Sequence, residues 1–181
     1  FLKEGYIMLY TMKTGILYQE PTHQAVAKMK GGLTGPVKEI YTGGEEPLME
    51  AEIQYNETES TADVRSKEYL LLDHDGHIVA EGHPEYAAGE APEEAGWPVC
   101  RMPRVDHAEV ELDGAKDLLT MGSGQSYTLS DEQGRELLRI RHRGILGGWN
   151  LEDSYGFSPE VLCGLFAFCR YIEQENELLI A

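Results

Sequence analysis

The chain has 181 residues and a formal net charge of −17, from 32 acidic and 15 basic side chains. This length suits a single domain over residues 1–181 with its own hydrophobic core, and 41% of the residues are apolar. The strong negative charge argues against non-specific binding to nucleic acid and against adsorption of the whole surface to an anionic membrane, and it favours a cationic partner.

The cysteines and the first residues bear on the cellular compartment. Charged side chains interrupt the first twenty residues, so we expect no signal peptide there. Cys100, Cys163 and Cys169 are odd in number, and two of them lie in an apolar segment. Such thiols are typical of buried cysteines in a reducing compartment, and the sequence therefore predicts a cytoplasmic protein.

Alternation of apolar and polar residues predicts β-strands through most of the chain. Residues 6–20 predict two strands joined by a turn near Thr14 and Gly15, and the alternation is clearest in residues 48–55 and 108–112. Residues 83–98 are rich in Gly, Pro, Ala and Glu, which predicts a long mobile loop in that segment.

Two segments share one hairpin pattern, Tyr-x-Leu-x-Asp-x-x-Gly. It occurs at Tyr69, Leu71, Asp73 and Gly76, and again at Tyr127, Leu129, Asp131 and Gly134. In each copy an alternating strand runs into an aspartate suited to a turn, and glycine then supplies a positive φ before the next strand. Repeated hairpins of this kind predict a meander or a barrel.

The last long segment predicts a helix over about residues 159–173. Ser158 is a suitable N-cap, Pro159 fits the first helical position, and Glu160 complements the helix dipole. Apolar residues then lie all around the helix, so we expect it to be surrounded by the rest of the protein. Arg170 lies near its C-terminal end. The run is shorter than the roughly 20 residues of a membrane span, so no transmembrane segment is expected; an oligomer contact is the alternative.

The densest basic segment is a candidate anion site. On an extended strand Arg139, Arg141 and Arg143 would share one face, opposite Leu138 and Ile140. Guanidinium groups suit phosphate or carboxylate groups, so the stripe is a candidate ligand site. The alternative is a solvated outer strand face whose arginines pair with acidic neighbours.

A second candidate is a metal site in the segment Asp73, His74, Asp75 and His77. All four side chains are potential metal ligands, which makes a metal-dependent hydrolase the rival function. The spacing matches no zinc or EF-hand pattern, however, and Asp75-Gly76 is a hairpin turn signal. We therefore expect a structural turn there, with no metal and no cofactor.

The repeated hairpins, the segment LLRIRHRGILGGWNLED (137–153) and the apolar helix together resemble the tubby C-terminal-like superfamily. This superfamily includes the tubby proteins, the phospholipid scramblases, the plant LURP-one-related proteins and small bacterial members, which are the nearest in size. The resemblance implies a closed antiparallel β-barrel of about twelve strands around a hydrophobic helix near the C-terminus. Tubby domains bind phosphoinositide headgroups through basic residues, so the resemblance also implies recognition of an anionic group.

The sequence thus predicts a mainly β, non-enzymatic, cytoplasmic binding module without a nucleic-acid partner. The expected ligand is an anionic group, phosphoinositide-like or another phosphate, at Arg139, Arg141 and Arg143. The alternatives are the metal-dependent hydrolase and a structural subunit whose acidic surface docks a basic protein partner. Beyond this anionic group, the sequence does not identify the ligand of the binding module.

Overall fold

The computed structural model describes residues 5–31, 35–56, 63–94 and 104–177. These residues form twelve β-strands, one α-helix and two short 3₁₀-helices, η1 (Val64–Ser66) and η2 (Gly144–Leu146). The strands are β1 (Met8–Lys13), β2 (Ile16–Gln19), β3 (Gln24–Lys30), β4 (Lys38–Tyr41), β5 (Met49–Tyr55), β6 (Lys67–Asp73), β7 (Ile78–Tyr86), β8 (Val105–Leu112), β9 (Ala115–Gly122), β10 (Ser126–Ser130), β11 (Glu136–His142) and β12 (Trp149–Asp153).

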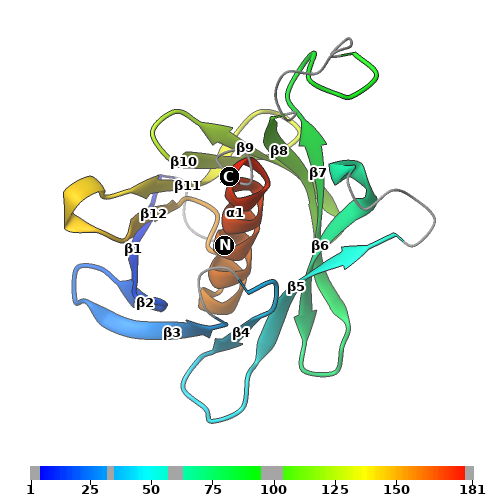
Figure 1. Cartoon of the computed structure of the whole chain (residues 1–181). Coiled ribbons are helices and arrows are strands. Elements are labelled where there is room, and N and C mark those ends of the chain that lie inside the picture. Colours follow the sequence, from blue (N-terminus) through cyan, green and yellow to red (C-terminus); the bar gives the residue numbers. More distant parts are fainter. Residues whose placement is uncertain (1–4, 32–34, 57–62, 95–103, 178–181) are drawn as a thin grey trace.

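The strands form a closed barrel in which each strand pairs antiparallel with the next in the chain (Figure 1). The ring closes between β1 and β12, where Met8 lies opposite Asp153 and Met12 lies opposite Trp149. Closure leaves every strand with two hydrogen-bonded neighbours and so removes the open sheet edges. The predicted closed, mainly β barrel is therefore confirmed.

The two copies of the repeated pattern fold into the same turn. The Oδ1 atom of Asp73 accepts hydrogen bonds from the backbone N–H groups two and four residues later, at 3.0 and 2.9 Å. Asp131 makes the same two bonds, both at 2.9 Å. Gly76 and Gly134 follow with φ values of +82° and +80°, a region that favours glycine. The predicted hairpins are confirmed, and the aspartate builds each turn.

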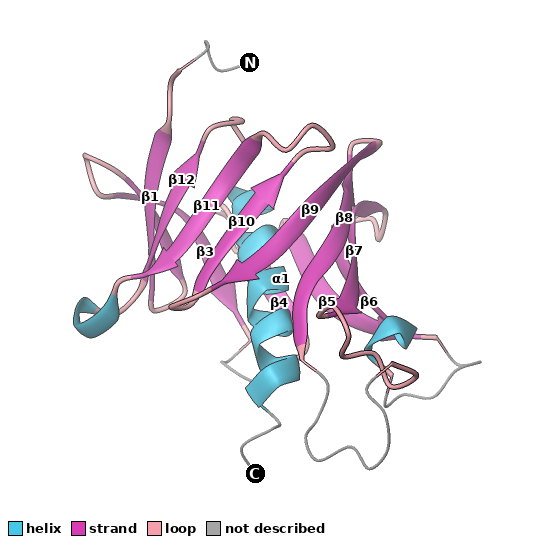
Figure 2. Ribbon diagram, turned by 90° about the horizontal axis from the view of Figure 1, so that it is seen from above, coloured by secondary structure: helices cyan, strands magenta, loops and turns pink. Residues whose placement is uncertain are grey.

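The helix α1 (Pro159–Glu177) lies inside the ring of strands (Figures 1 and 2). It begins at the predicted Pro159 but extends to Glu177 rather than to about 173. Buried apolar side chains occur on all its sides, and they are Leu162, Cys163, Leu165, Phe166, Ala167, Phe168, Cys169, Tyr171 and Ile172. Among the described residues, no helix has both the length and the hydropathy needed to cross a bilayer.

Polar contacts fix the end of α1 to the barrel wall. Asn176 accepts a hydrogen bond from the backbone N–H of Val105 at 3.0 Å and donates one to the carbonyl of the same residue at 2.8 Å. Lys67 of β6 forms an ion pair with Glu175 at 2.8 Å. The helix packs most closely against β3–β6, β8 and β9, so it lies toward that side of the barrel.

The prediction of a loop over residues 83–98 is wrong for its first part. Strand β7 continues to Tyr86, and Pro84 faces Ala108 of β8. The buried face of β7 carries Ala80, Gly82 and Pro84. Glycine and proline are typical of loops, which is why the sequence predicted a loop here. At Gly82 the absence of a side chain makes room for Phe168 of the helix. Residues 95–98, as well as Cys100, lie outside the described residues.

Candidate functional site

The predicted arginine stripe lies on the outer face of β11. Leu138 and Ile140 are buried, whereas Arg139 and Arg141 point away from the barrel interior, as the alternation predicted. The strand ends at His142, so Arg143 lies in the turn before η2 and does not continue the stripe. The outer face of β11 therefore carries two of the three predicted arginines.

Both arginines of this face are paired with carboxylates. The Nη2 atom of Arg139 lies 2.5 Å from Glu136 Oε2, and this pairing raises the pKa of the guanidinium. The Nη2 atom of Arg141 lies 3.2 Å from Glu152 Oε2 on β12. This arrangement favours the alternative in which the stripe is a solvated outer face.

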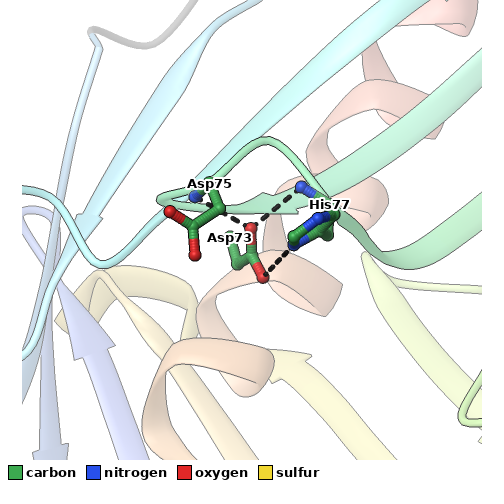
Figure 3. A group of neighbouring side chains, drawn as sticks. All are labelled: Asp73, Asp75 and His77. Atoms are coloured by element: carbon green, nitrogen blue, oxygen red, sulfur yellow. Dashed lines mark hydrogen bonds and ion pairs between the residues drawn. The ribbon is translucent and has the colours of Figure 1, made fainter.

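The predicted metal ligands gather at the turn between β6 and β7 (Figure 3). Ligand atoms of Asp73, Asp75 and His77 lie within 4.8 Å of one another, and His74 Nε2 lies 3.3 Å from Asp75 Oδ2. Hydrogen bonds from the turn's own backbone lower the pKa of Asp73. Asp131 makes the same turn, so the predicted structural turn accounts for the position of the Asp73 carboxylate, and the metal site stays an untested alternative.

A cavity of about 730 Å³ lies at the other end of the barrel, between the C-terminal half of α1 and the strand wall. This volume is ordinary for a small-molecule site. Its lining combines apolar side chains, polar side chains and turn residues, namely Met12, Thr14, Gly15, Met29, Lys30, Gly31, Lys38, Gln125, His142, Gly148, Trp149, Phe166, Arg170 and Glu173.

Two glycines shape the mouth of the cavity. Gly15, in the turn between β1 and β2, has φ +77°, and Gly148, just before β12, has φ +79°. A Cβ atom would lie 2.8 Å from the carbonyl oxygen of Met29 at the first position and 2.7 Å from that of Met12 at the second. A side chain at either position would collide with the neighbouring strand, so glycine allows each turn to pack closely against that strand.

Arg170 and Glu173 form an ion pair at the helix side of the cavity. Their side chains are only 20% and 12% exposed. Glu173 also accepts hydrogen bonds from the Gln125 side-chain amide at 3.0 Å and from the Tyr127 hydroxyl at 3.2 Å. These three donors hold the Glu173 carboxylate, which in turn fixes the position of the Arg170 guanidinium.

Trp149 of β12 is the aromatic centre of the cavity wall. The Arg170 guanidinium lies 5.7 Å from the centre of the indole ring, a cation–π contact. Phe166 and His142 meet the same indole edge-on, with ring centroids at 5.6 and 4.9 Å. His142 Nδ1 accepts a hydrogen bond from the Gly144 N–H at 3.0 Å, so the neutral ring carries its proton on Nε2 and can donate it.

Lys38 brings a second cation to the cavity. It is 4% exposed and shares the inward face of β4 with Ile40. Burial lowers its pKa, and the positive charge of Arg170 lowers it further. Lys30 also lines the cavity, but its ammonium group lies 4.6 Å from the centre of the Tyr41 ring. Of the three cations that line the cavity, Lys38 and Arg170 are therefore the ones that are largely buried.

Replacing Lys38 with Met should change how stability depends on pH. The pKa of Lys38 is lower in the folded chain than the 10.5 of an ordinary lysine, so between the two values the unfolded chain binds more protons. Stability from this site therefore rises with pH across that window. Urea unfolding should show wild type gaining stability over Lys38→Met as the pH approaches about 10.5. A constant difference would contradict the buried position of the ammonium group.

This cavity was not predicted from the sequence, although the positions of Lys38, His142 and Arg170 in their elements indicate it. Lys38 stands two residues before the buried Ile40, and His142 stands two residues after the buried Ile140. Strand alternation therefore places both side chains on inward faces. Arg170 interrupts the apolar helix at the level of these side chains.

No protein-family model matches the chain, and no curated protein matches it significantly. The resemblance to the tubby C-terminal-like superfamily accordingly stays a prediction.

Proposed function

We propose that the protein is a binding module that holds a small anionic ligand in the cavity at the end of the barrel. The observation that carries this proposal is the meeting of Lys38 and Arg170 in a concave, partly apolar site of a chain with a net charge of −17. In a partly desolvated site, charge-assisted hydrogen bonds to an anion are stronger than at an exposed surface. His142 supplies a further donor.

The fold supports the same proposal through the resemblance of the sequence. A closed barrel around a C-terminal helix is the architecture that membership of the tubby C-terminal-like superfamily implies, and we propose that membership. The anion site would then lie in the cavity instead of on the outer arginines, because Arg139 and Arg141 already pair with Glu136 and Glu152. Phosphate, phosphoinositide-like and carboxylate groups all suit the two cations of the cavity.

The test compares Arg170→Met with Arg139→Met. The two arginines are matched, because each pairs with a glutamate three residues away, one inside the cavity and one on the outer face. Binding of inorganic phosphate, inositol trisphosphate and hexanoate is followed by Trp149 fluorescence in a Trp97→Phe background. We expect Arg170→Met to weaken binding of any anion that binds by about 30-fold or more, because it removes a buried charged partner.

Lys38→Met provides an independent variant, since Arg170→Met leaves the Glu173 carboxylate without its guanidinium and can reduce folding. Lys38→Met should weaken the same anion, and Arg139→Met should bind it as tightly as wild type. Absence of binding to all three anions by folded wild type would overturn the proposal. So would loss of binding in Arg139→Met with retention in the two cavity variants.

A further inference from the structure

We infer that the barrel carries a second binding site, for a cation that presents hydrogen-bond donors, such as an ammonium group or a hydrated magnesium ion. The site is a cavity of about 210 Å³ beside the start of β9, and its lining residues are Gly114, Ala115, Lys116, Asp117, Asp131, Glu132, Gln133 and Arg135. Because successive strands run antiparallel, the turns before β9 and after β10 lie at the same end of the barrel as the β6–β7 turn. This site, which we call the β9 notch, is therefore at the opposite end from the proposed anion cavity.

The β9 notch exists because β9 continues past the end of β10. Strand β10 ends at Ser130, which lies opposite Leu118. Residues 115–117 still pair with β8, where Asp117 lies opposite Val110, but they have no partner in β10. The chain turns toward β11 after Ser130 and leaves a gap in the wall beside these residues. The register of the strands thus places Asp117 at the edge of the gap.

Asp117 is the central residue of the notch, because its carboxylate is buried without a partner. The residue is only 6% exposed, and it makes no hydrogen bond or ion pair with the described part of the chain. Burial without a partner is costly for a carboxylate. Among the described residues, the Tyr69 hydroxyl is the only fully enclosed side-chain polar atom that lacks a hydrogen bond. The Asp117 oxygens are therefore not sealed in protein, and they open into the notch that the residue lines.

The two basic side chains of the notch have carboxylate partners of their own. Arg135 Nε lies 2.7 Å from Asp131 Oδ2. Lys116 Nζ lies 3.6 Å from Glu109 Oε1, outside the notch. Because neighbouring residues of a strand point to opposite faces, Lys116 also points away from Asp117. Neither base is paired with Asp117, which leaves this carboxylate available to a cation from solution.

Two further carboxylates surround Asp117 with negative charge. Glu132 is exposed and has no hydrogen bond or ion pair with the residues that the structure describes, and Asp131 retains its pairing with the turn. Burial raises the pKa of Asp117, and the negative charges of Asp131 and Glu132 raise it further. The three carboxylates therefore lie close enough to repel one another. A bound cation would offset this repulsion and give Asp117 the partner that it lacks.

The spacing of these carboxylates selects the kind of cation. In the described ranges, Asp73, Asp75 and His77 are the group whose ligand atoms gather within 4.8 Å, and the acids of the notch form no such group. Calcium takes about six to eight oxygen ligands directly, so separated carboxylates suit it poorly. Magnesium keeps most of its waters and binds through one or two carboxylates, and an ammonium group has three N–H donors. Both cations reach separated carboxylates through hydrogen bonds.

The test uses four probes on the full chain: hexaamminecobalt(III), magnesium, propylammonium and calcium. Hexaamminecobalt(III) does not exchange its ammonia ligands, so it binds only through its N–H groups. Titrations in about 0.15 M NaCl screen the general attraction of cations to an acidic protein. Binding is measured by calorimetry and located by NMR shifts of the Gly114 and Gln133 amides. We expect hexaamminecobalt(III) to bind in the notch, and a comparison of magnesium with propylammonium to distinguish a hydrated metal ion from an ammonium group.

Three single substitutions locate the site. Asp117→Asn keeps the shape of the side chain and should weaken binding at least about tenfold, because hydrogen bonds to a charged group are strong. Cations should also raise the melting temperature of wild type but not of this variant. Glu132→Gln, at an exposed position that leaves folding intact, should weaken binding about threefold. Asp75→Asn, an exposed acid in the hairpin cluster at the same end of the barrel, should bind as wild type does.

Three results would overturn the inference. The first is that none of the four probes binds to folded wild type. The second is that binding is lost in Asp75→Asn and retained in Asp117→Asn, which would place the cation at the β6–β7 turn. The third is that calcium binds through Asp117 while hexaamminecobalt(III) and propylammonium do not, which would show a dehydrated ion in the notch.

Discussion

Replacing Phe168 with alanine should lower the free energy of unfolding by about 3–5 kcal/mol, the largest effect we expect from a single substitution. Phe168 is fully buried at the centre of the barrel. Its ring packs near Tyr69, with centroids 5.8 Å apart, and near Tyr171. It also lies against Gly82 of β7, where an added Cβ would come within 3.2 Å of the ring. The closed barrel cannot contract enough to fill the space of the removed ring, so a cavity should remain.

The measurement is urea unfolding followed by circular dichroism. Phe168→Leu retains most of the apolar volume and should lose less stability than Phe168→Ala. Ile145→Ala is the exposed control, since this side chain projects into solvent from η2 and its removal should change stability by less than about 0.5 kcal/mol. A loss below about 1 kcal/mol for Phe168→Ala would contradict a packed barrel interior.

Replacing Asp153 with alanine should cost about 3 kcal/mol, because it leaves the buried N–H group of Phe157 and two partly buried N–H groups without an acceptor. The Asp153 carboxylate is fully buried and accepts hydrogen bonds from the backbone N–H groups of Tyr155, Gly156 and Phe157, at 3.0, 2.9 and 2.9 Å. Burial raises the pKa of Asp153 even though these three donors lower it. The residue thus forms the connection from β12 to the start of the helix.

The matched control is Asp131→Ala. Asp131 accepts backbone hydrogen bonds in the same manner, but its turn is exposed, so water replaces the lost acceptor and the loss should stay near 1 kcal/mol. Asp153→Asn keeps one carbonyl acceptor and should fall between wild type and Asp153→Ala. Thermal unfolding of the four proteins compares them directly. Equal losses for Asp153→Ala and Asp131→Ala would contradict the buried role of Asp153.

Local signals predicted the elements of the fold well. Asp73 and Asp131, each with a glycine three residues later, predicted two hairpins. All the residues that form such a turn lie within a stretch of five. Pro159 marked the start of the helix for the same local reason. The pairing of Met8 with Asp153 joins residues at opposite ends of the strand sequence, and no local pattern specifies that register. Ring closure came from the family resemblance instead.

The site was harder to predict because its residues become neighbours only through closure. Lys38, His142 and Arg170 lie far apart in the sequence, and each by itself suggests a solvated polar residue. The arginines of β11 were predicted as a site because they are close together in the sequence. Residues that meet only inside the folded barrel give no such signal. The inward positions beside Ile40 and Ile140 were the available signal, and it requires knowledge of which strand face is buried.

In the part of the chain that the structure describes, the helix that fills the barrel follows all twelve strands, and this order has a consequence for folding. The inward side chains of the strands are covered only when α1 is present. A nascent chain that ends before Pro159 therefore lacks the helix that fills the barrel. The ring also closes between its first and last strands, and this one pairing joins residues far apart in the chain, so it should form slowly. We therefore expect stable structure to form only once α1 has been synthesised, and the unfilled barrel wall to be prone to aggregation until then.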